Sequence, residues 1–213
     1  MLGKILRQSP RAVGVGIYFG ENIARPADAV LQSPILTNKK VIWSTQLDGE
    51  GRILTSRFAR TYSRQAGMNE LTPDRDGIIR RYSYSGEPIP HMLSQIIKLT
   101  NPEKAQMPSH SPLINYRGPT RTFNTITGEK IINGRVPDGF FKDKIVVIGG
   151  LDSEGQTYQT PVGPMPRAEI FANILDNQIH GRWTKKLSFT QSLLLILIFV
   201  IFAALITSFY PQT

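Results

Sequence analysis

Residues 141–150 read Phe-Lys-Asp-Lys-Ile-Val-Val-Ile-Gly-Gly, and this stretch decides the predicted fold. A charged segment leads into the β-branched run from Ile145 to Ile148, and two glycines follow it. An unbroken apolar run of strand length is typical of a strand that is covered on both faces, as in a parallel sheet between helices. The stretch therefore predicts an α/β domain.

Segments on both sides of this strand alternate between strand and helix patterns. Further strands are expected, from their β-branched and aromatic content, at residues 12–19, 40–44 and 78–84. Helices are expected, from apolar spacing and end signals, at residues 26–32, 89–99 and 168–180. The weak periodicity of residues 52–65 predicts an exposed connection, and Asp74 to Gly77 predicts a turn. This order predicts a mostly parallel central sheet flanked by helices.

One uncharged apolar stretch lies near the carboxyl end, at residues 189–209. It is about as long as the roughly 20 residues that span a bilayer, so it predicts a transmembrane helix with the lipid bilayer as partner. Residues 182–188 contain Arg182, Lys185 and Lys186 and are expected to be a basic juxtamembrane linker. Residues 1–181 are then expected to form one globular domain.

Composition argues against several classes of protein. The chain carries a formal net charge of +9, but its Lys and Arg residues are scattered and form no basic run among aromatics, so nucleic acid is not an expected partner. There are 3 histidines, far apart in sequence, and no cysteine, so we expect no metal site and no disulfide. No cofactor motif is present: the glycines after Ile148 lack dinucleotide-binding spacing.

An ordered set of short motifs resembles a known family. The motifs are Asp76-Gly77-Ile78-Ile79-Arg80-Arg81, Leu113-Ile114-Asn115-Tyr116, Phe141 to Gly149, Thr160-Pro161, Met165-Pro166 and Glu169 to Leu175, followed by the hydrophobic span. In this order they resemble the CHASE type 2 domain, an extracytoplasmic sensory domain found on bacterial adenylate cyclases, histidine kinases and serine/threonine kinases. The resemblance covers roughly residue 10 to the end of the chain.

The resemblance implies a sensor of an unknown small-molecule ligand at the cell membrane, outside the cytoplasm, with no enzymatic activity of its own. Family members usually have an upstream transmembrane helix and an opening strand, and further spans that lead to a cytoplasmic kinase or cyclase domain. The chain has neither of the first two, so we expect an amino-terminally incomplete receptor. A missing strand leaves an unpaired sheet edge, which predicts either poor solubility or pairing with another chain, and a homodimer is the expected pairing.

Candidate ligand-binding residues come from the motifs that carry the resemblance. They are Arg80, Arg81, Asn115, Tyr116, Asp152 and Thr160. The family usually carries an Asp shortly before Thr160-Pro161, whereas here Asp152 and Glu154 stand further upstream, which predicts an altered ligand or none.

Each candidate also has a structural interpretation. An arginine forms two parallel hydrogen bonds to an anion, but adjacent strand residues face opposite sides, so at most one of Arg80 and Arg81 lines a given pocket and either is open to being a solvated surface residue. For Asn115 and Tyr116 the sequence favours a role in holding backbone and core in place over contact with a ligand.

Two other functions stay open from the sequence. A membrane-bound hydrolase would use Asp76, Asp152 or Glu154 as acid and base, which requires two carboxylates that converge in one cleft. A tail-anchored cytosolic scaffold is favoured by the positive charges that precede the hydrophobic span. Against the scaffold, the family resemblance places the domain outside the cytoplasm, because an upstream helix sets the orientation of complete members.

Overall fold

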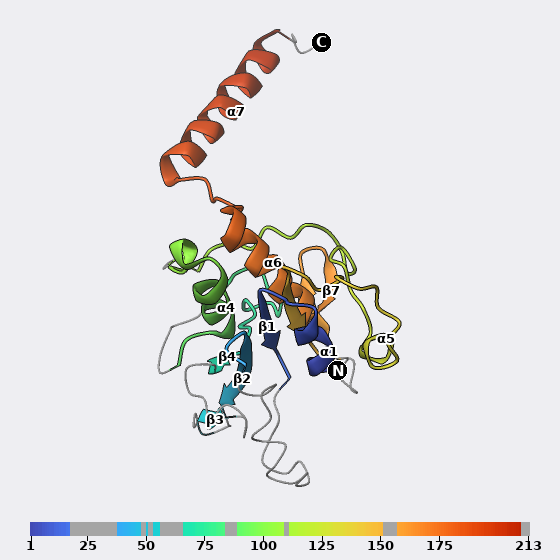
Figure 1. The fold of residues 1–213 in the computed structure, drawn as a ribbon. Coiled ribbons are helices and arrows are strands. Elements are labelled where there is room, and N and C mark those ends of the chain that lie inside the picture. Colours follow the sequence, from blue (N-terminus) through green and yellow to red (C-terminus); the bar gives the residue numbers. More distant parts are fainter. Residues whose placement is uncertain are drawn as a thin grey trace. The chain divides into compact units, whose positions relative to one another are not determined.

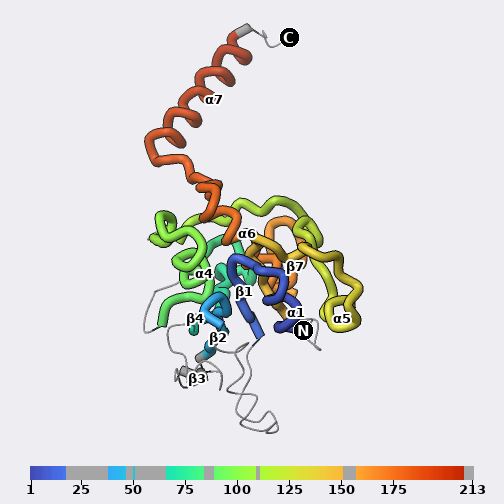
Figure 2. Tube along the Cα trace, viewed as in Figure 1, coloured from blue at the N-terminus to red at the C-terminus, as the bar shows by residue number. Residues whose placement is uncertain are grey.

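A computed structural model describes residues 1–17, 38–47, 50, 53–55, 66–83, 89–108, 111–150 and 157–209. The chain divides into two compact units, Met1–Trp183 and Thr184–Thr213. Figures 1 and 2 trace both units in chain order.

The helices of the first unit are α1 (Leu2–Arg7), α4 (Met92–Thr100), the 3-10 helix η2 (Pro102–Lys104), α5 (Gly128–Ile132) and α6 (Arg167–His180). The strands are β1 (Ala12–Val15), β2 (Val41–Leu47), β3 (Ile53–Thr55), β4 (Ala66–Met68), β5 (Ile145–Ile148), β6 (Thr157–Thr160) and β7 (Gly163–Pro166). The second unit contains α7 (Phe189–Phe209).

The central sheet is mostly parallel, as predicted. β1 pairs in parallel with β2 on one side and with β5 on the other, and β2 pairs in parallel with β4. Among the described strands of this sheet, only β3 runs antiparallel. Trp43 is paired with both Val15 and Ala66, so β1 and β4 lie on opposite sides of β2. The four parallel strands therefore stand in the order β4-β2-β1-β5.

Each face of the sheet has its own hydrophobic core. Alternate residues of β5 pack on opposite sides: Ile145 and Val147 contact the cluster that includes α4 and α6, and Val146 and Ile148 belong with the cluster that includes α1 and α5. The helices lie on the two sides of the strands in Figure 1. The apolar run is therefore continuous because both of its faces are buried, which confirms the predicted α/β class.

Most of the predicted elements are present with shorter or shifted bounds. β1, β2 and β5 lie within or across the predicted strands, and α4 begins at Met92 rather than residue 89. α6 ends at His180, and Gly181 after it has a φ of 65°, the left-handed cap expected there. The predicted helix at residues 26–32 lies outside the described residues.

The predicted strand at 78–84 is wrong as a regular strand. Over 78–83 the chain makes only isolated bridges, Ile78 with Gln159 and Arg81 with Leu113. The pairing partner changes along the segment, so no continuous ladder forms although the side chains have strand propensity.

Residues 52–65 are not wholly a connection, because β3 lies within them and pairs with β2. The structure also contains three further strands that the sequence periodicity did not predict, β4, β6 and β7. β4 and β7 contain glycine or proline, and all three are only three or four residues long, so their patterns are too short to recognise.

α7 is long and apolar enough to cross a membrane. Residues Phe189–Ser208 have a mean hydropathy of 2.7, and none of that window is buried against other parts of the structure. This is the helix that the sequence predicts as membrane-spanning.

Candidate functional site

The carboxyl edge of the parallel sheet holds a small cavity. β2 and then β4 are added on one side of β1, and β5, which comes later in the chain, is added on the other side. The direction in which strands are added therefore reverses between β1 and β5. Open α/β sheets bind ligands outside the carboxyl ends of the strands at such a reversal. A cavity of about 20 Å³ lies there, lined by Gly16, Val147, Ile148, Gly149, Gly150, Arg167, Ala168 and Phe171.

The last rung of the sheet on the α4 and α6 face consists of very small residues. Val15 of β1 is paired with Trp43 of β2 and with Ile148 of β5. The next residue along each strand is Gly16, Ser44 and Gly149, respectively, and Ser44 is paired with Gly67 of β4. A Cβ atom on Gly149 would lie 2.6 Å from the Cβ atom of Ala168, and one on Gly67 would lie 2.6 Å from the Met92 nitrogen. The missing side chains thus let the first turns of α6 and α4 rest directly on the sheet.

Two buried polar atoms at this edge have no hydrogen-bond partner among the residues that the structure describes. They are Ser44 Oγ and Asn69 Oδ1, and both residues are 0% exposed. The Asn69 side chain is held by its other end, since Nδ2 donates to the carbonyl oxygen of Gly16 at 3.0 Å. An unpaired buried polar atom costs about 1–3 kcal/mol, and native proteins keep few of them.

α6 begins beside the cavity without a side-chain cap. Its N-cap residue is Pro166, which offers no hydrogen bond to the first amides of the helix. Arg167, the first helical residue, is held by Tyr158, whose hydroxyl accepts from Nε at 3.1 Å and whose ring lies 5.3 Å from the guanidinium. Among the described residues no carboxylate pairs with Arg167, so this edge presents a positive charge together with a helix amino terminus.

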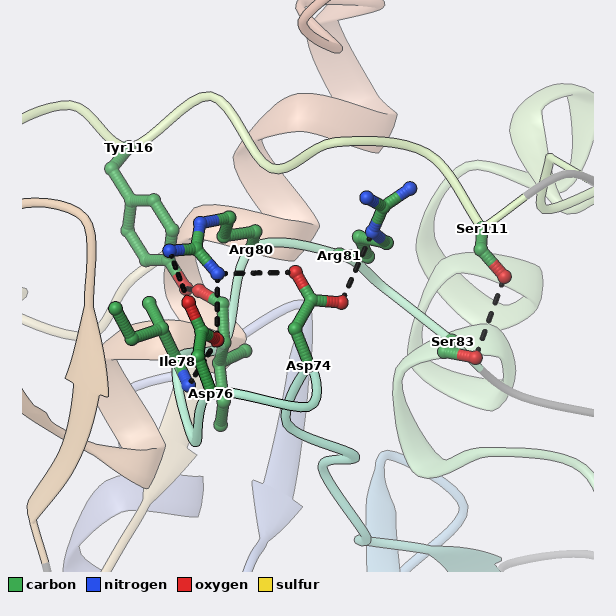
Figure 3. A network of polar contacts seen from close by, with 9 residues as sticks. Asp74, Asp76, Ile78, Arg80, Arg81, Ser83, Ser111 and Tyr116 are labelled. Atoms are coloured by element: carbon green, nitrogen blue, oxygen red, sulfur yellow. Dashed lines mark hydrogen bonds and ion pairs between the residues drawn. The ribbon is translucent and has the colours of Figure 1, made fainter.

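Arg80 and Arg81 lie together in an ion-pair network (Figure 3). Arg80 donates to both carboxylate oxygens of Asp76, at 2.8 and 2.7 Å, and lies 3.4 Å from Asp74, while Arg81 Nε lies 3.1 Å from Asp74. The hydrogen bonds from Arg80, with one from the Ile78 amide, lower the pKa of Asp76 to about 2. In return, the Asp76 carboxylate raises the pKa of Arg80.

This network accounts for the predicted turn. The Gly77 amide donates to the Asp74 carbonyl and the Asp74 amide to the Ile78 carbonyl, each at 2.9 Å, which closes the turn over 74–78. Arg80 forms ion pairs with Asp74 and Asp76, the two acidic residues of this turn. The two carboxylates therefore converge on an arginine at the surface, and neither lines the cavity at the sheet edge.

Tyr116 is held against the 78–81 segment, and Asn115 is held against α6. The Tyr116 hydroxyl donates to the Ile79 carbonyl at 2.8 Å, and burial raises the pKa of that hydroxyl above its usual value. The backbone of Asn115 is bound by a side chain of α6: its amide donates to Asn177 Oδ1 at 2.6 Å and its carbonyl accepts from Asn177 Nδ2 at 2.9 Å. The Tyr116 side chain thus holds the backbone of 78–81, whereas Asn115 has an exposed side chain and is held through its own backbone.

Thr160 closes the turn between β6 and β7. Its hydroxyl donates to the Gly163 carbonyl at 2.6 Å and accepts from the Val162 amide at 3.3 Å. Asp152 and Glu154 lie outside the described residues. The structure thus joins Arg80, Arg81 and Tyr116 through the 78–81 segment, and none of the described candidates lines the cavity.

Sequence reasoning missed a polar ladder on α6, formed by Glu169, Asn173 and Asn177. The Glu169 carboxylate accepts from the backbone amides of Arg121 and Thr122, each at 2.9 Å, and Asn173 Oδ1 accepts from the Arg117 amide at 3.0 Å. With Asn177 they bind the backbone of 115–122 along the helix. Their spacing of four residues, which puts them on one helix face, was the available signal.

A second missed residue is His91, the N-cap of α4. Its Nδ1 accepts from the Leu93 amide at 3.2 Å, and its Nε2 lies 3.1 Å from the Glu70 carbonyl, so Nε2 carries the proton. The buried ring packs edge-on between Tyr82 and Phe171, at 5.3 and 5.5 Å. Burial lowers the pKa of His91 to about 4.

The comparison with protein families agrees with this architecture. The family model described as "CHASE2 domain" matches residues 1–206. The chain belongs to the CHASE2 domain family. Comparisons with curated proteins and with solved structures gave no match.

Membership of the CHASE2 family establishes the general role of the domain. CHASE2 domains are extracytoplasmic sensory domains rather than catalytic ones. The apolar helix α7 is consistent with membrane association of this CHASE2 domain.

Proposed function

We propose that this CHASE2 domain is the ligand-sensing module of a membrane-bound receptor, and that α6 relays the bound state of the sheet edge toward the membrane helix. Residues 1–181 would form the sensor, 182–188 the basic juxtamembrane linker and 189–209 the membrane span.

The observation that carries this proposal is the course of α6. The helix begins at Arg167, beside the cavity at the carboxyl edge, and runs for 14 residues to His180. Only residues 182–188 separate its Gly181 cap from α7. A ligand that binds at this edge with different affinity for two positions of α6 would shift the population between them.

The alternatives are less well supported. A hydrolase needs converging carboxylates in a cleft, and Asp76 is instead paired with Arg80 at the surface. Asp152 and Glu154 lie outside the described residues. A cytosolic scaffold conflicts with the extracytoplasmic placement of the CHASE2 family.

Cysteine labelling in intact cells tests the proposal, because the native chain has no cysteine. The exposed Lys142 and the terminal Thr213 lie on opposite sides of α7 in the sequence, so K142C and T213C form a matched pair. A membrane-impermeant maleimide should label K142C in intact cells and T213C only after permeabilisation. The reverse pattern would support the cytosolic scaffold and overturn the receptor proposal.

A further inference from the structure

The residues that lead into the apolar helix carry positive charge that no acidic residue balances. Lys185 and Lys186 are both exposed, and neither pairs with a carboxylate among the described residues. No Asp or Glu follows Asp176 in the sequence, and the Asp176 carboxylate already contacts Arg117 and His180. The two ammonium groups are therefore available to a partner with negative charge.

The start of α7 is fixed by two reciprocal hydrogen bonds. The Ser188 hydroxyl accepts from the Gln191 amide at 3.2 Å, and Gln191 Oε1 accepts from the Ser188 amide at 2.9 Å. This arrangement is a capping box, which marks the first turn of a helix. The lysines thus lie directly before a helix whose first turn is held at Ser188.

The length of α7 places the lysines near the lipid headgroups. Its 21 residues rise about 31 Å, close to the roughly 30 Å thickness of the hydrocarbon core, so Phe189 lies at the boundary of that core. Extended chain covers at most about 3.6 Å per residue, which keeps Lys186 within about 11 Å and Lys185 within about 14 Å of the boundary. The headgroup layer is about 5–8 Å thick, and the attraction of its charge extends a further 8 Å or so at physiological salt.

The side chains beside the lysines match a membrane surface. Leu187 is 61% exposed and Phe189 is 83% exposed. At a bilayer interface, apolar side chains of this kind enter the acyl layer while ammonium groups stay among the headgroups. An acidic protein segment would neutralise the two lysines but would not by itself cover these apolar side chains.

We propose that Lys185 and Lys186 bind the phosphate groups of anionic phospholipids in the leaflet at the amino-terminal end of α7. Lysine binds phosphate as a point charge, and each juxtamembrane lysine favours an anionic surface over a neutral one. This assignment rests on the membrane span of the proposed receptor. It gives the linker between α6 and α7 a partner that holds its end at the membrane surface.

A fluorophore at residue 190 tests the lipid preference in the full chain, because T190C introduces a single cysteine at an exposed position. The labelled chain is placed in nanodiscs of equal parts phosphatidylglycerol and phosphatidylcholine, with brominated acyl chains on one lipid or on the other. Brominated phosphatidylglycerol should quench the fluorophore about twofold or more as strongly as brominated phosphatidylcholine. The ratio should fall toward one at high salt, because salt screens exposed charges.

Variants locate the preference. In the T190C chain, K185Q/K186Q should bring the quenching ratio to one, and K185R/K186R should keep it. The matched control K130Q/K142Q removes the same charge from exposed positions of the globular unit and should also keep the native ratio. Equal quenching by the two lipids in the unaltered linker, or a preference that survives in K185Q/K186Q, overturns the proposal.

The lipid contact and the sensor role fail separately. If K142C is labelled in intact cells and the two lipids quench equally, the lipid contact is wrong and the sensor role stands. If K142C labelling requires permeabilisation while phosphatidylglycerol is preferred, the sensor role is wrong and the lipid contact stands. If neither lipid quenches the fluorophore, α7 does not enter the bilayer and both proposals fall.

Discussion

Glu169 shows how one buried side chain holds a distant segment. It is 8% exposed and accepts backbone hydrogen bonds from residues 121 and 122. E169A leaves those amides without a partner, so we expect a loss of about 2–3 kcal/mol in the free energy of unfolding, measured by urea denaturation. E169Q keeps an acceptor and should lose less.

The control for Glu169 is E129Q on α5, where the side chain is exposed. That variant should change the free energy of unfolding by less than about 0.5 kcal/mol. Equal losses in E169A and E129Q would show that the ladder does not hold the 115–122 backbone.

His91 makes the stability of the domain depend on pH. Its pKa falls from 6.5 to about 4 on folding, so between these values the unfolded state binds more protons and stability rises with pH. As pH falls from 7 to 4, this residue should remove about 3 kcal/mol from the free energy of unfolding. Urea denaturation at pH 4, 5, 6 and 7 measures the slope.

H91N tests the assignment, since asparagine keeps an N-cap acceptor but does not titrate. The variant should be less stable at pH 7, because the ring contacts with Tyr82 and Phe171 are lost, and nearly flat from pH 7 to 5. Asp76 affects stability only at lower pH, because its stabilising contact is lost as pH falls from 3.8 through about 2.

At the scale of elements, the contact of α6 with β5 depends on the absence of a side chain at Gly149. G149A places a Cβ 2.6 Å from the Ala168 Cβ, so the first turn of α6 must shift. We expect a loss of about 1–3 kcal/mol in the free energy of unfolding, measured by thermal and urea denaturation.

The double variant G149A/A168G restores the space and serves as the control. Its stability should exceed the sum of the two single effects by about 1 kcal/mol or more, which a double-mutant cycle reads directly. Additive effects would mean that α6 does not rest on Gly149.

An element was predictable from the sequence when the pattern that stabilises it lies within its own residues. β5 and α6 carry their patterns within themselves, as a continuous apolar run and as an apolar face with a Gly181 cap. The 78–83 segment has strand propensity but changes partners from Gln159 to Leu113, and β4 extends over only three residues. Pairing of that kind is set by distant residues, so propensity did not identify it.

At the scale of the whole molecule, the carboxyl boundary of the globular unit lies at Trp183. Its indole donates to Gln178 Oε1 at 3.1 Å and packs 6.3 Å from the Tyr82 ring, and the Arg182 amide donates to the Asn177 carbonyl. A fragment of residues 1–183 should therefore be about 2 kcal/mol more stable to urea than one of residues 1–181. Equal stability of the two fragments would place the boundary at Gly181, as the sequence suggested.

The sequence alone determined the α/β class, the CHASE2 resemblance, the membrane-length helix and the bounds of α6 to within a residue. These features depend on the order of neighbouring residues, because apolar runs, helical spacing and capping glycines act locally. None of the described candidate ligand residues named from motifs lines the cavity. Arg80, Arg81 and Tyr116 lie in a network about 78–81 (Figure 3), and Thr160 lies in a hairpin turn. The backbone of Asn115 is held by Asn177 on α6.

Only the tertiary structure brought Ser44, Asn69, Gly149 and Arg167 to one edge, from residues far apart in the chain. None of them stands out alone, since a serine, an asparagine, a glycine and an arginine are common residues. Their placement arises from sheet register, which sets the face of each side chain, and from burial, which leaves two of their polar atoms without a hydrogen-bond partner among the described residues. Sheet register and burial both depend on contacts between distant residues, so a local stretch of sequence does not predict them.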